Sequence, residues 1–145
     1  MNQFHDRLLA VAGAVDELDG LSIEDPGLDG SEVAQEVDPV MQQVGVVSNQ
    51  SIIVAGTKTP HLLPDLVPPM DRQWTGAFFG WWPIDPQNRH TAIFTEAYTA
   101  FVSIATTATP SRLVGDGWRT SATKVLDNAV VAYCSLNGIK PRGQA

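Results

Sequence analysis

The sequence predicts a single all-α domain of about six short helices, with a proline-rich connector in the middle of the chain. Apolar residues recur at steps of three and four along most of its length, which is the period of an α-helix. Serine, threonine or aspartate precedes several of these stretches and glycine or proline follows them, as expected for helix caps and stops. The sequence contains no internal repeat and no β-hairpin signal.

Two helices separated by a loop are predicted at the start of the chain. The first covers residues 3–19 and has its apolar positions on one face: Phe4, Leu8, Val11, Val15 and Leu18. Residues 20–30 hold a proline and three glycines, which favours a loop. A second apolar stripe begins at Val33, and we expect Pro39 to interrupt it because proline lacks the backbone N–H of the helix ladder. Asp38 would then cap a new turn that runs to Val44.

The centre of the chain consists of a short apolar element and the connector. Residues 51–55 are predicted to form a helix after Ser48, since their Ile-Ile-Val run has no evident strand partner. Residues 58–70 are rich in proline, which makes this connector stiff without being helical. Asp71 is expected to cap the next helix, and Gly80 to end it.

Two further helices are predicted in the C-terminal half. An apolar stripe runs through residues 93–108 and is stopped by Pro110. Thr120 or Ser121 caps the last helix, which ends before Gly138.

The predicted domain covers residues 1–138 and is followed by a frayed tail at 139–145. Residues 1–44 form its acidic N-terminal helices and residues 45–138 its core.

The chain has a net charge of −7, and most of its 16 acidic residues precede residue 39. This pattern indicates either a solvated acidic face or a segment that contacts a basic surface on a partner. Broad nucleic-acid binding is disfavoured, because phosphate neutralisation requires a cationic surface.

The chain is expected to be a cytoplasmic protein that does not enter the membrane. Its single cysteine, Cys134, excludes an internal disulfide. No basic-then-apolar leader follows Met1, and no apolar run has the length of a membrane span.

Charged residues around the connector are the candidate catalytic and binding groups. Lys58 and Asp71 are candidate catalytic residues, since a desolvated lysine can act as a nucleophile and an aspartate at a helix start can orient a water. Each also has a structural interpretation, at a helix C-terminus and as an N-cap respectively. The polar binding candidates are His61, Arg72, Lys124 and Asp127. The last two also suit an i,i+3 ion pair.

An aromatic-rich segment follows the connector. It contains Trp74, Phe78, Phe79, Trp81 and Trp82. One face of a short helix cannot bury all five side chains, so Trp81 and Trp82 are candidates for an exposed docking patch, the alternative being that they build the core. The three histidines are isolated from one another, and no cysteine–histidine or carboxylate–histidine pair has the spacing of metal ligands, so we predict no metal site and no cofactor.

Two blocks of the sequence resemble a family of uncharacterised bacterial proteins. The first, within residues 57–72, reads Lys-x-x-His-Leu-Leu-Pro-x-Leu-x-Pro-Pro-x-Asp-Arg, and the second is the Thr-Ser-Ala-Thr-Lys-Val-Leu-Asp-Asn-Ala run at 120–129. The resemblance covers about residues 45–133 and implies no activity. Pro60 stands where leucine is usual in that family.

A weaker resemblance is to the helix–hairpin–helix DNA glycosylases. Val44-Gly45-Val46-Val47 is similar to their hairpin turn, and Asp71 after two prolines is similar to the aspartate that opens their next helix. The resemblance implies a nucleic-acid-processing protein that uses Lys58 and Asp71. Val47 replaces the second glycine of the turn, whose missing side chain lets backbone N–H groups approach a phosphate.

The favoured hypothesis is a non-catalytic binding or regulatory module that acts through contacts with a protein partner or a second copy of itself. It rests on the acidic front half, the surplus of tryptophans and the missing metal motif. The alternative is the glycosylase-like protein, so enzymatic activity remains open at this stage.

Overall fold

The computed structural model describes residues 2–44, 63–71, 73–80 and 90–141. Its elements are α1 (Asn2–Leu18), α2 (Gly30–Val44), α4 (Trp74–Phe79), α5 (His90–Ala108), the 3-10 helix η1 (Pro110–Leu113) and α6 (Ala122–Leu136). These ranges contain no strand, and the helices form one compact domain, which confirms the predicted all-α fold. The helix predicted at residues 51–55 lies outside the described residues.

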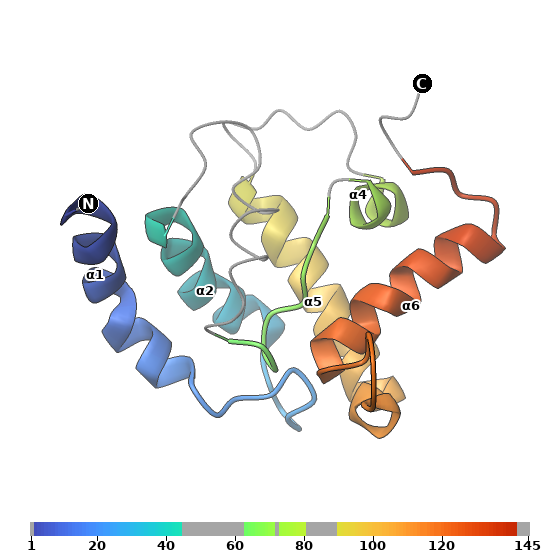
Figure 1. Ribbon diagram of the computed structural model, residues 1–145, viewed down its shortest axis with the longest axis horizontal. Helices are drawn as coiled ribbons and strands as arrows, with labels where there is room; N and C mark the ends of the chain where they lie inside the picture. The colour runs from blue at the N-terminus through green and yellow to red at the C-terminus, as the bar shows by residue number, and fades with distance from the viewer. Residues whose placement is uncertain (1, 45–62, 72, 81–89, 142–145) are drawn as a thin grey trace.

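The helices pack in two groups around α5. α2 lies between α1 and α5 and contacts both (Figure 1). On the other side, α6 contacts α4, η1 and α5. None of the described helices combines the length and apolarity needed to cross a membrane.

The aromatic side chains of α5 form the centre of the core. Phe94, Tyr98 and Phe101 are fully buried, and the Phe94 and Tyr98 rings stack with centroids 5.6 Å apart. Leu66 and Met70 from the connector are also fully buried. Since burying such a side chain stabilises a fold by about 1.5–3 kcal/mol, the connector contributes to the core as a helix would.

Three consecutive carbonyls of the connector are each bound to a different part of the chain. The Pro64 carbonyl accepts a hydrogen bond from the Thr123 hydroxyl of α6. The Asp65 carbonyl accepts one from the Ile23 N–H in the α1–α2 loop at 3.0 Å, and the Leu66 carbonyl accepts one from the Tyr98 hydroxyl at 3.1 Å. These bonds hold the described part of the connector against helices on both sides.

The predicted interruption of the second helix at Pro39 is wrong. α2 continues through Pro39, whose side chain is exposed. Val37 and Met41, before and after it, are both buried in the same core, so packing across the proline offsets the single lost ladder bond. Asp38 is buried within the helix and accepts a hydrogen bond from Nε2 of Gln42 at 2.6 Å instead of capping a new turn.

Candidate functional site

The predicted site residues divide into two groups. Five of them lie outside the residues that the structure describes: Lys58, His61, Arg72, Trp81 and Trp82. Asp71, Lys124 and Asp127 are described, and each has a defined hydrogen-bonding role.

Asp71 caps the first turn of α4, as its position in the sequence predicts. Gln73, directly before Trp74, already has helical backbone angles (φ −80°, ψ −58°) and provides no side-chain cap of its own. One carboxylate oxygen, Oδ1, accepts the N–H of Gln73 at 2.7 Å and the N–H of Trp74 at 2.6 Å. In return, the buried Thr75 hydroxyl accepts the N–H of Asp71 at 3.2 Å. This reciprocal arrangement satisfies backbone donors that the first turn of a helix leaves free. Gly80 ends α4 with a φ of 73°, a conformation that favours glycine.

Lys124 and Asp127 form the i,i+3 ion pair that their spacing indicates. The Lys124 Nζ donates to Asp127 Oδ2 on the first turns of α6. Ser121 caps the same helix, because its side-chain oxygen accepts the Lys124 N–H at 3.2 Å. Within the described part of the chain, no hydrogen bond or ion pair joins Asp71 to this pair.

Cys134 is fully buried on α6, and its sulfur lies 3.9 Å from the carbonyl oxygen of Trp74. Burial raises the pKa of its thiol above the ordinary value, and the negative charge of Asp71 raises this pKa further. Because the thiolate is the reactive form of cysteine, this residue acts as a packing group between α6 and α4.

α6 leaves an apolar strip uncovered along its C-terminal half. We call Ala129, Ala132, Tyr133 and Leu136 the α6 strip, since helical spacing places them on adjoining faces. All four are exposed, Tyr133 by 52% and Leu136 by 87%. The Tyr133 ring meets that of Phe78 on α4 edge-on, with centroids 5.5 Å apart.

Trp118 adds a further exposed aromatic group beside α6. Its carbonyl accepts a hydrogen bond from Nδ2 of Asn128, at the middle of the helix, at 3.2 Å. Its side chain is 81% exposed. The docking patch predicted from aromatic surplus at Trp81 and Trp82 lies outside the described residues, whereas Trp118 and the α6 strip were missed. Helical periodicity could not identify the α6 strip, because the apolar positions of an exposed strip look like those of a core face. Trp118 lies outside any predicted helix, so periodicity does not mark it.

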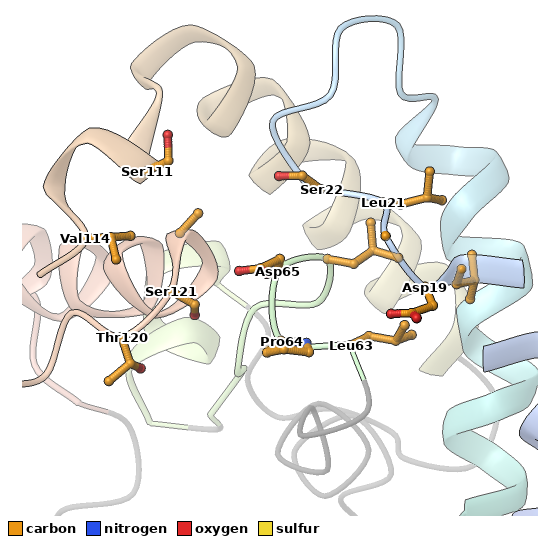
Figure 2. Close-up of a pocket in the computed structure, with 14 residues that line it drawn as sticks. Asp19, Leu21, Ser22, Leu63, Pro64, Asp65, Ser111, Val114, Thr120 and Ser121 are labelled. Atoms are coloured by element: carbon orange, nitrogen blue, oxygen red, sulfur yellow. The ribbon is translucent and has the colours of Figure 1, made fainter. Parts of the chain in front are cut away.

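A cavity of about 470 Å³ lies near the other end of α6. Its walls come from the end of α1 and the following loop, the connector turn at 63–66, η1 and the residues at the start of α6 (Figure 2). The sequence carries no signal for this cavity, because its lining comes from separate segments that share no motif. Asp65, a charged residue within the proline-rich connector at 58–70, is the lining residue closest to the candidates named from the sequence.

The comparisons with known proteins add no relative. No family model, curated protein or solved structure matches this chain. The resemblances to uncharacterised bacterial proteins and to the DNA glycosylases therefore stay predictions.

Proposed function

We propose that this chain is a non-catalytic cytoplasmic binding module that acts through protein–protein contacts made by the α6 strip and Trp118. One observation carries the proposal. Trp118, Tyr133 and Leu136 keep large apolar side chains in water on one helix and on the segment hydrogen-bonded to it. Burying a side chain of this kind is worth about 1.5–3 kcal/mol, so a partner that covers all of them gains substantial affinity.

The composition of the surface supports a protein as the partner. Tryptophan and tyrosine are enriched at the centres of protein interfaces, where they combine large contact areas with few rotatable bonds. The Tyr133 ring is already positioned by its contact with Phe78, which lowers the conformational entropy lost on binding.

The charge of the chain disfavours a nucleic acid as the partner. The net charge is −7. The same charge opposes approach to a nucleic acid backbone.

The position of Asp71 supports binding over the glycosylase-like alternative. Its Oδ1 accepts two backbone N–H groups at the start of α4. A catalytic role that used this oxygen would compete with the cap, which stabilises a helix by about 0.5–2 kcal/mol.

The proposal is tested with Leu136→Glu and a matched control, Leu9→Glu. Leu9 is also exposed, by 62%, but lies on α1. Tagged wild-type and variant chains are used to capture partners from an extract of the source cells, and recovered proteins are quantified by mass spectrometry. Sedimentation velocity of each purified chain measures self-association, and circular dichroism verifies the fold.

We expect Leu136→Glu to remove a partner, or a self-associated species, that wild type and Leu9→Glu both retain. Equal recovery and equal sedimentation for all three folded chains would contradict the proposal.

A further inference from the structure

The cavity at the start of α6 is a second feature that the proposed function does not use. Its volume of about 470 Å³ falls within the range of small-molecule pockets, roughly 300–1,000 Å³. We propose that this cavity binds a small hydroxylated primary amine in its protonated form. The inference is independent of the α6 strip, which occupies the opposite half of the helix.

The wall that carries Asp65 is fixed before any ligand arrives. Its own carbonyl and those of the residues on either side, Pro64 and Leu66, are hydrogen-bonded to three other segments. A second link holds η1, which contributes Ser111 to another wall of the cavity: the Glu24 carboxylate accepts the Ser111 N–H at 2.5 Å. A site built from such fixed segments loses little conformational entropy on binding.

Asp65 is directed at the cavity. Figure 2 shows its side chain pointing from the connector turn toward the side formed by Ser111, Val114 and Ser121. The carboxylate takes no hydrogen bond and no ion pair from any residue in the described ranges. It is therefore available to a ligand.

The hydroxyl of Ser121 is not available in the same way. Thr123 donates its only hydroxyl proton to the Pro64 carbonyl, so the 3.0 Å contact between the two hydroxyls must have Ser121 as the donor. Ser121 also accepts the N–H of Lys124. Its proton is committed within the protein, and this hydroxyl can offer a ligand only a lone pair.

The remaining polar side chains of the lining are two carboxylates and three hydroxyls. The carboxylates of Asp19 and Asp65 are acceptors only, and the lining contains no lysine, arginine or histidine among the described residues. The Ser22, Ser111 and Thr120 hydroxyls can both donate and accept. A complementary ligand must therefore supply several donors and a positive charge, which a protonated amine with hydroxyl groups provides.

The rest of the lining suits a carbon skeleton. Leu21, Leu63 and Val114 contribute apolar surface. A few polar groups on an apolar wall are typical of pockets that orient a small organic molecule. An anionic ligand is disfavoured, because it would meet Asp19 and Asp65 without a cationic side chain of the lining to compensate.

The test uses glucosamine as the probe and N-acetylglucosamine as its neutral counterpart. Titration of the isotope-labelled full chain at about pH 6.5, where the amine is protonated, is followed by amide chemical shifts. The variant Asp65→Asn removes the carboxylate but no known hydrogen bond of the fold. Glu36→Gln, an exposed acidic position on α2 outside the lining, removes the same charge elsewhere.

We expect glucosamine to shift the amides at 19–22, 63–66 and 120–122. Asp65→Asn should raise the dissociation constant about tenfold and Glu36→Gln less than twofold. The absence of shifts in these segments would overturn the proposal. Equal weakening by both variants, or equal binding of N-acetylglucosamine, would also overturn it, since the first indicates general attraction to an acidic chain and the second shows that the amine charge is not recognised.

Discussion

The phenol hydroxyl of Tyr98 donates a hydrogen bond to the backbone carbonyl of Leu66 across 3.1 Å, inside the core. Both residues are fully buried. The bond joins the central helix α5 to the connector. Because it holds the residue next to Asp65, it links core packing to the geometry of the cavity.

Removing this hydroxyl should destabilise the fold. In Tyr98→Phe the Leu66 carbonyl loses its side-chain donor in a buried position, which costs about 1–3 kcal/mol. Urea unfolding monitored by circular dichroism measures the change. Tyr133→Phe, at an exposed tyrosine, is the matched control and should change stability by less than about 0.5 kcal/mol. Equal stability of both variants would show that the Tyr98 bond contributes nothing.

The stability of the chain should also fall in alkaline solution because of the same residue. Burial raises the pKa of Tyr98 well above its ordinary value. The unfolded chain releases this proton from about pH 10, while the native protein retains it. The native state binds more protons in this range, so its stability is intact below pH 10 and decreases as the pH rises further.

Unfolding midpoints between pH 9 and pH 11 check this dependence. The wild type should lose more stability across the interval than Tyr98→Phe, which has no phenol to ionise. Parallel losses in both chains would assign the alkaline effect to other groups.

Local features of this fold could be predicted from the sequence, whereas its long-range contacts could not. The caps at Asp71 and Ser121 depend on hydrogen bonds within three residues, so residue type and spacing suffice to predict them. The bond between Tyr98 and Leu66 spans 32 residues, and no periodicity indicates it. The wrong prediction at Pro39 has the same origin. Proline usually interrupts a helix, but here the packing of the residues before and after Pro39 keeps α2 continuous.

The cavity could not be predicted for a related reason. Its lining combines the loop after α1, the connector turn and the start of α6, and only folding brings these segments together. The sequence marks Asp65 as one charged residue among several in the connector. The position of its backbone depends on the bonds that fix the carbonyls of residues 64–66.

Replacing Asp71 with alanine should weaken α4. The variant loses two hydrogen bonds from backbone N–H groups, and loss of an N-cap costs about 0.5–2 kcal/mol. Asp71→Asn should retain part of this stability, since asparagine is also a good N-cap. Thermal unfolding ranks the three chains, and a loss in Asp71→Asn as large as in Asp71→Ala would contradict a capping role.

Replacing Pro39 with alanine should stabilise the chain. Proline inside a helix removes one ladder bond and crowds the preceding turn, at a cost of about 3 kcal/mol relative to alanine. Proline also restricts the unfolded chain, which offsets about 0.4–1 kcal/mol of that cost. We therefore expect a net gain of more than about 1 kcal/mol in the free energy of unfolding. A lower unfolding midpoint for Pro39→Ala would show that α2 depends on the geometry that the proline imposes.

Gly30 and Gly13 should respond in opposite directions to the same substitution. A Cβ atom at Gly30, the first residue of α2, would lie 2.9 Å from the Cα of Thr99 on α5. Since that neighbour is backbone, the two helices must separate, and we expect Gly30→Ala to cost about 1–3 kcal/mol. At Gly13, within α1, no atom beyond the neighbouring backbone of the same helix lies within 4 Å of the added Cβ. Gly13→Ala should therefore stabilise the chain by about 0.5–1 kcal/mol through its higher helix propensity.

Chemical denaturation of both variants alongside the wild type provides the comparison. Helix propensity acts at both positions, so a difference of opposite sign isolates the contact between α2 and α5. If Gly30→Ala were as stable as Gly13→Ala, the close approach of α2 and α5 at Gly30 would not limit the size of the residue there. That outcome would contradict the prediction.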